Sequence, residues 1–486
     1  MKNNIQLFLV FFIVGCLTFG KGGLCLVECG LVLCSIILFF LTEILTLKQN
    51  RVKCLTKEVL KNPYVYFVLL VITILLFQYF NKSGSYVKLS GIWMFCESDC
   101  CRFLPSSITI AGSENNGLFY LLCSICVLLI IFTTSITLIK KEHLIIFSWI
   151  VVILTTLNSF GFILYTKFGY NLFNAFYFLE RLSPSGTYPY HPHGNVYYMI
   201  SMAYAFLLVV YYVAIKKHKL LIFTLFFSIA IMYLAVLASN GFGGIIISTV
   251  TILLFSIYVF LSSLQNKKWN LSFGKVIVVM TTILFFGCIY SHLFATHNYI
   301  EEVSELKEQG LEKRMNIQKI NRDIVKTGGD FNVLIGKKDL SWGNLIYGRG
   351  VGSYVMVSQF YFISNKNFQK NRNSDIYERY EIPNISHSNL MGILIECGII
   401  GFLLYVCLFV FISYKAFSIN KHNQIMYPLL QVFLFIALYS VFDNAFDNLF
   451  IIISLTVLLS LQRNTILDDY NKFPKNESVS SARKKY

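Results

Sequence analysis

Long apolar segments recur along this chain, and shorter polar stretches separate them. Runs of 18 or more apolar residues are typical of helices that cross a membrane. They lack the strict alternation of apolar and polar residues that marks the strands of a β-barrel. We therefore predict an all-α, polytopic integral membrane protein with about 12 transmembrane helices. The predicted spans are residues 5–20, 24–47, 64–80, 117–139, 143–165, 195–215, 219–238, 242–264, 274–294, 388–414, 425–442 and 445–462.

The distribution of positive charge predicts the orientation of these spans. Only 14% of the 486 residues are charged, and the net charge is +16. If both termini are cytoplasmic, the short inner segments hold 22 Lys and Arg and the short outer segments hold six. Such an excess of basic residues on one side is the usual mark of the cytoplasmic face. The basic balance therefore needs no nucleic acid or other acidic partner to explain it.

This orientation places three long loops, residues 81–116, 166–194 and 295–387, outside the cytoplasmic membrane. The loop over 295–387 is far longer than a usual connection, which suggests a function of its own. It contains Val303, Leu306, Leu311, Ile317, Ile320 and Ile324 at roughly helical spacing, which predicts an amphipathic helix packed on the membrane domain. We divide the chain into a membrane domain over 1–466 and a disordered, basic cytoplasmic tail over 467–486.

Three polar residues stand out where the long loop enters the next apolar run, in the segment from Ile385 to Tyr405. His387 can titrate near neutral pH. Glu396 lies inside the apolar run, where a carboxylate is costly and usually faces protein or water. Asn389 and Glu396 are seven residues apart and share a helix face, whereas His387 and Glu396 do not. The alternatives are an interfacial histidine that caps the span and a buried pairing role for Glu396.

A turn-rich segment, S-P-S-G-T-Y-P-Y-H-P-H-G-N, ends in the sixth predicted span. It holds His191, His193 and Asn195, and Arg181 comes just before it. A metal site would need a third ligand, and the spacing supplies none, so we predict no metal. A loop that binds sugar hydroxyls or phosphate fits this composition, and a plain rigid turn is the alternative.

Two glycine-rich segments complete the candidate chemistry. A-S-N-G-F-G-G, from Ala238 to Gly244, contains Asn240 and forms a predicted outer hairpin, whose glycines also suit simple helix packing. Y-G-R-G-V-G-S-Y, from Tyr347 to Tyr354, contains Arg349, which can bind phosphate through two parallel hydrogen bonds. Its glycine-rich turn could also point backbone N–H groups at an anion. It lacks the G-K-[ST] of a nucleotide-binding loop.

Three segments of the chain resemble the O-antigen polymerase and O-antigen ligase superfamily of membrane glycosyltransferases. They are H-S-N-L-M-G-I-L-I-E-C-G-I-I-G, G-R-G-V-G-S-Y and G-T-Y-P-Y-H-P-H-G-N-V-Y-Y-M. The resemblance implies an enzyme of the bacterial cytoplasmic (inner) membrane that acts at its extracytoplasmic face without metal, cofactor or nucleotide sugar. One difference is that Ser239-Asn240-Gly241 stands where family members often carry Ser-x-Arg or Ser-Arg.

The chemistry of such a reaction assigns roles to the candidate residues. His387 is the expected base or hydroxyl-orienting group, because a catalytic base works best with a pKa near ambient pH. Arg349 and Arg181 are the expected diphosphate ligands. Glu396 is expected to organise the site. The remaining expected substrate contacts are His191, His193, Asn195, Asn240 and Asn389.

The resembling motifs do not separate a polymerase from a ligase. The resemblance taken together with the long loop over 295–387 favours a polymerase that joins polyprenyl-diphosphate-linked oligosaccharide repeat units. Two alternatives stay open: an O-antigen ligase that transfers glycan to lipid A–core, and a lipid-linked sugar flippase or other transporter. The expected partners are the lipid-linked donor and acceptor and the membrane lipid, with a chain-length regulator and a separate flippase as further candidates. No nucleic-acid partner is expected.

Overall fold

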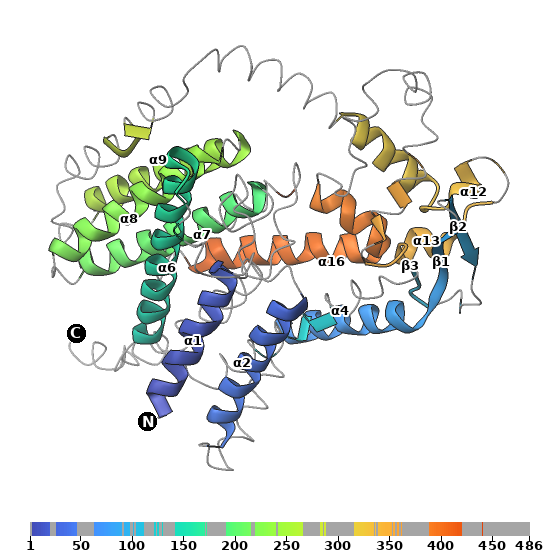
Figure 1. Cartoon of the computed structure of the whole chain (residues 1–486), viewed down its shortest axis with the longest axis horizontal. Helices are drawn as coiled ribbons and strands as arrows, with labels where there is room; N and C mark the ends of the chain where they lie inside the picture. Colours follow the sequence, from blue (N-terminus) through green and yellow to red (C-terminus); the bar gives the residue numbers. More distant parts are fainter. Residues whose placement is uncertain are drawn as a thin grey trace, which may run out of the picture.

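A computed structural model of the chain shows a mostly helical protein (Figure 1). The residues that the structure describes are 2–19, 26–45, 63–89, 92–97, 101, 104–110, 121–122, 124–125, 129, 141–170, 172, 191–214, 219–239, 242–265, 282–284, 286–287, 315–334, 336, 339–351, 353–354, 357–358, 361, 388–419 and 440.

The long helices coincide with predicted spans. They are α1 (Lys2–Phe19), α2 (Leu26–Ile44), α4 (Pro63–Phe80), α6 (Lys141–Phe168), α7 (His191–Ala214), α8 (Lys219–Ala238), α9 (Phe242–Gln265) and α16 (Asn389–Ile419). Within the described part of the chain, four segments are long and apolar enough to cross a membrane: Ile145–Phe168, Gly194–Tyr212, Leu220–Ala238 and Leu390–Cys407. The predicted spans over 117–139, 274–294, 425–442 and 445–462 lie largely or wholly outside the described residues.

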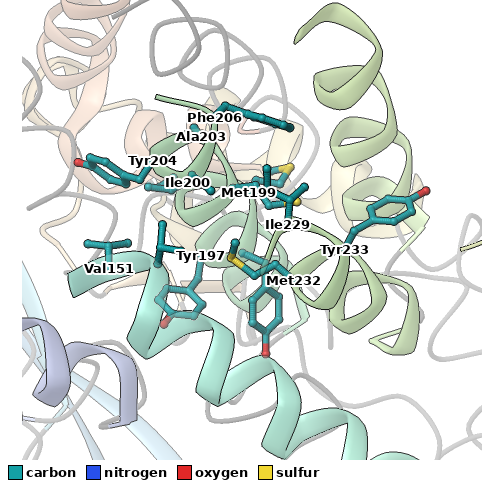
Figure 2. Packing of buried hydrophobic residues seen from close by; sticks show 14 of the residues in the cluster. Val151, Tyr197, Met199, Ile200, Ala203, Tyr204, Phe206, Ile229, Met232 and Tyr233 are labelled. Atoms are coloured by element: carbon teal, nitrogen blue, oxygen red, sulfur yellow. The ribbon is translucent and has the colours of Figure 1, made fainter. Parts of the chain in front are cut away.

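Helix α7 forms the centre of the helical core, where its side chains are buried against α6, α8 and α9. Figure 2 shows its aromatic residues, with Tyr197, Tyr204 and Phe206 fully buried. One buried polar pair in this core is hydrogen-bonded: Thr155 of α6 donates to the hydroxyl of Tyr197 at 2.8 Å. Because other helices rather than lipid surround α7, it can carry such polar residues along an apolar segment.

The chain also contains a three-stranded sheet, so the predicted all-α class needs a correction. The strands are β1 (Lys82–Leu89), β2 (Ile92–Glu97) and β3 (Ser107–Ile110), in the order β2-β1-β3. Strand β1 pairs antiparallel with β2 and parallel with β3. Aromatic and β-branched residues in the segment after α4 favour extended structure. The helical bias of membrane segments does not apply to a loop that lies outside the apolar runs.

Helix α16 is broken at Gly398, where the backbone is non-helical (φ 66°, ψ −166°). The predicted span over 388–414 is therefore two helical segments, 389–397 and 399–419, with a kink between them (Figure 1). The candidate membrane-crossing segment Leu390–Cys407 runs across this break.

Part of the long loop packs on this first segment. The described parts include a helical stretch over 315–326, α12 (Phe331–Leu334) and α13 (Trp342–Tyr347). The predicted apolar residues Ile317, Ile320 and Ile324 are all buried. A small second core joins this helix to the loop and to α16 through Ile320, Ile324, Tyr354, Val357, Tyr361 and Ile395. The loop and the break in α16 thus belong to one packed unit.

Candidate functional site

The glycine-rich loop after α13 is hydrogen-bonded to α16 just before the break at Gly398. The backbone N–H of Arg349 donates to the carbonyl of Ile395 at 3.0 Å, and that of Gly350 donates to the carbonyl of Glu396 at 2.9 Å. Carbonyls at the end of a helical segment lack partners inside the helix. The loop therefore caps the first segment of α16.

Glycine at position 398 allows this close docking. Its φ of 66° lies in the left-handed region that residues with a side chain rarely adopt. A Cβ atom there would also overlap the carbonyl group of Ile346. The backbone of α13 therefore lies directly against the backbone of α16 at the break.

Gln78, in the last turn of α4, is a third support that the sequence analysis did not identify. Its side chain is almost fully buried. Nε2 donates to the carbonyls of Tyr347 and Glu396, each at 3.3 Å, and Oε1 accepts from the N–H of Val351 at 3.4 Å. The carbonyl of Gln78 in turn accepts from the hydroxyl of Ser107 in β3 at 2.5 Å. The available sequence signal was an amide residue near the outer end of an otherwise apolar span.

The carboxylate of Glu396 also holds the loop. Its Oε1 accepts a hydrogen bond from the N–H of Tyr354 at 3.0 Å. The hydroxyl of Tyr354 donates to Oδ1 of Asn321 at 2.8 Å. Burial, and then the negative charge of Glu396, raise the pKa of the Tyr354 hydroxyl. Glu396 thus helps to hold this loop against α16.

The backbone of this loop does not offer the anion site that its glycines suggested. Each described N–H group from Gly348 to Tyr354 donates to a protein acceptor. The guanidinium of Arg349 is the remaining anion-binding group in the described part of this loop. Arg349 is 8% exposed, and its aliphatic part packs on Gly329 at the end of the preceding helical stretch. Any anion held here would be held by this side chain rather than by backbone N–H groups.

A second group of predicted residues meets at the start of α7. Asn195 is fully buried, and its Oδ1 accepts a hydrogen bond from the hydroxyl of Ser239 at 2.7 Å. Gly244 of α9 packs so closely on Asn195 that a Cβ atom at 244 would overlap its side chain. Asn195 of α7 therefore contacts Ser239, which follows α8, and Gly244 of α9. In this structure Asn195 connects three helices and is covered by protein.

The other predicted residues are only partly described. His387, Arg181 and Asn240 lie outside the described residues. His191 and His193 are in the first turn of α7, and Asn389 is in the first turn of α16. The structure describes the backbone of these three residues but not their side chains. In Figure 1, α13 and the sheet lie at one end of the molecule and α8 and α9 at the other. Among the described candidate side chains, Arg349 and Glu396 thus belong to the same packed unit, and Asn195 belongs to the helical core around α7.

The described residues include no group of three His, Cys, Asp or Glu side chains able to hold a metal ion. The function has to be argued from Arg349, Glu396 and the groups around them. Compared as a whole with known protein families and with curated protein sequences, the chain matches none of them.

Proposed function

We propose that this protein is a membrane glycosyltransferase that polymerises polyprenyl-diphosphate-linked oligosaccharide repeat units at the extracytoplasmic face. One observation carries the proposal: the loop with Arg349 is docked on α16 through Glu396. These two segments are separate in sequence, and both carry the resemblance to the O-antigen polymerase superfamily. Their direct contact supports a common role in one site.

The proposed reaction is a glycosyl transfer. A hydroxyl of the acceptor sugar attacks the anomeric carbon of the donor, and the bond from that carbon to the diphosphate oxygen breaks. Arg349 stabilises the charge that grows on the departing diphosphate. His387, directly before the buried Ser388 that starts α16, takes the proton from the attacking hydroxyl.

The position of the helix break favours an enzyme over a transporter. Transporters with broken helices bind their substrates near the middle of the membrane. Here the carbonyl of Glu396, just before the break, accepts a hydrogen bond from Gln78 in the last turn of the apolar helix α4. This contact with the end of an apolar helix supports a site at the membrane surface, where a lipid diphosphate headgroup would lie.

The test is an assay of purified protein in lipid nanodiscs with defined lipid-linked repeat units. The wild type is expected to give a ladder of longer glycans, and His387→Ala and Arg349→Lys should both lose most of it. A lysine at 349 retains the charge but not the paired donors. The control is Arg322→Lys, since Arg322 is exposed on the helical stretch 315–326.

Three results would contradict the proposal. A wild-type ladder from His387→Ala would remove that residue as the base. No ladder from the wild type, with transfer of glycan to an added lipid A–core acceptor, would indicate a ligase instead. Movement of the lipid-linked unit across the bilayer without a new glycosidic bond would indicate a flippase.

A further inference from the structure

Helix α13 presents an apolar face to the outside of the protein. Trp342 is 69% exposed and Ile346 is 37% exposed. They are four residues apart and therefore lie on the same side of the helix. Asn344, on the opposite side, contacts Gly328. The outward face of α13 thus consists of a tryptophan and an isoleucine, which is costly to expose to water.

The contacts of α13 place it at a defined depth. The backbone of Ile346 lies against Gly398, and the carbonyl of Tyr347 accepts a hydrogen bond from Gln78 in the last turn of α4. The end of α13 therefore sits between the ends of two apolar helices. Helix α4 ends at Phe80 and β1 begins at Lys82, so Gln78 and the end of α13 lie near the end of an apolar helix rather than beside its middle.

Phe80, the last residue of α4, is a second exposed aromatic residue near the same end of that helix. It is 78% exposed and lies two residues after Gln78, which binds the end of α13. Tryptophan and other aromatic residues are enriched where membrane proteins cross the boundary between headgroups and acyl chains. An aromatic residue at the end of α4 and another on α13 fit that boundary.

We propose that α13 is an interfacial helix that inserts Trp342 and Ile346 into the outer leaflet of the membrane. The occupant of this face is bilayer lipid, at the level where headgroups meet acyl chains. The end of α13 is hydrogen-bonded to the last turn of the apolar helix α4 through Gln78, and this position at the end of an apolar helix selects lipid over a protein partner. The inference does not depend on the proposed function.

This placement has a consequence for the neighbouring loop. Arg349 follows α13 by two residues, so the insertion of Trp342 would hold the loop at the membrane surface. A helix anchored on one side by lipid and on the other by Gln78 and Gly398 has little freedom to move away. The loop would then keep a fixed height above the acyl chains.

The test uses the whole protein labelled with 5-fluorotryptophan and placed in lipid nanodiscs. The chain has four tryptophans, Trp93, Trp149, Trp269 and Trp342, so four ¹⁹F signals are expected. The variant Trp342→Phe assigns the signal of interest. Broadening is measured with nitroxide lipids labelled at acyl carbon 5 or 16, and separately with a soluble gadolinium chelate.

We expect the Trp342 signal to be broadened at least threefold more by the carbon-5 label than by the carbon-16 label, and only weakly by the chelate. Trp149 is the reference, because it lies within the apolar segment of α6 and donates a hydrogen bond to Tyr212. Its signal should be insensitive to the chelate.

Two outcomes would overturn the inference. Strong broadening of the Trp342 signal by the chelate, with little effect of the lipid labels, would place Trp342 in water. Insensitivity to all three probes would mean that protein covers α13, either a second copy of the chain or another part of it.

Discussion

The N–H of Tyr354 donates a 3.0 Å hydrogen bond to Oε1 of Glu396. The carbonyl of the same glutamate accepts from the N–H of Gly350 at 2.9 Å and from Nε2 of Gln78 at 3.3 Å. Glu396 therefore holds both ends of one loop, with its backbone and with its side chain. This relationship assigns a positioning role to a carboxylate that is costly inside an apolar run.

Replacing Glu396 tests that role through two substitutions. Glu396→Gln keeps an oxygen acceptor for the N–H of Tyr354 and should change stability little. Glu396→Ala leaves that N–H without its acceptor, which costs about 1–3 kcal/mol for a buried group. The unfolding midpoint in increasing SDS measures the difference. Equal midpoints for the two variants would show that the hydrogen bond contributes nothing to stability.

Gly398→Ala is expected to destabilise the protein strongly. A left-handed backbone costs a residue with a side chain about 1–2 kcal/mol, and the new methyl group would also overlap the carbonyl group of Ile346. The matched control is Gly15→Ala in α1, where a methyl group would meet nothing within 4 Å. SDS unfolding of both variants compares them. A Gly398→Ala variant as stable as the control would mean that α16 is not broken at this position.

Gln78→Leu should loosen the loop from α4. It removes two donated hydrogen bonds and the acceptor for the N–H of Val351, at a cost of about 1–3 kcal/mol for each polar group left unpaired. Thr73→Val is the control, since Thr73 is exposed on the same helix and donates to its own backbone at Leu69. The expected result is a lower SDS midpoint and a shortened glycan ladder for Gln78→Leu alone. Wild-type values for both would exclude Gln78 as a support of the loop.

The raised pKa of Tyr354 predicts a loss of stability at alkaline pH. Burial, followed by the charge of Glu396, raises this pKa in the folded state above the ordinary tyrosine value of about 10. The folded state then binds more protons than the unfolded state above pH 10, so the contribution of Tyr354 is complete below that pH and falls as pH rises further.

The variant Tyr354→Phe isolates this contribution from the other tyrosines. It lacks the hydrogen bond to Asn321, so it should be less stable than the wild type at pH 8 by about 1 kcal/mol. The difference between the two proteins should shrink between pH 10 and 11.5, measured by SDS unfolding at each pH. A difference that stays constant over this range would contradict the raised pKa.

Hydrophobic patterning alone located the helices well. Each long helix of the structure begins and ends within several residues of a predicted span. In a membrane-crossing helix every backbone hydrogen bond is made within the segment, so local sequence suffices to define it. Helical spacing also identified Ile317, Ile320 and Ile324 as one apolar helix face, and all three are buried in the structure.

The sheet formed by β1, β2 and β3 was not predicted. Its strands are short, and β3 reaches β1 only after an intervening segment that Asn81 holds through hydrogen bonds to Cys101, Leu104 and Pro105. Strand pairing depends on partners outside the segment, so a period-two pattern over four to eight residues carries little information by itself.

The chemistry of Arg349 and Glu396 was visible in the residue types, but the docking of the Arg349 loop on α16 was not. Gln78 precedes Glu396 by 318 residues, and no periodicity in the sequence relates them. The use of the loop N–H groups as helix caps, in place of an anion site, likewise depends on where α16 breaks. The sequence by itself determined the membrane helices and the candidate side chains, because both depend on local composition. Only the tertiary structure decided which carbonyls, amides and carboxylates meet, because hydrogen bonds are directional and join groups that are far apart along the chain.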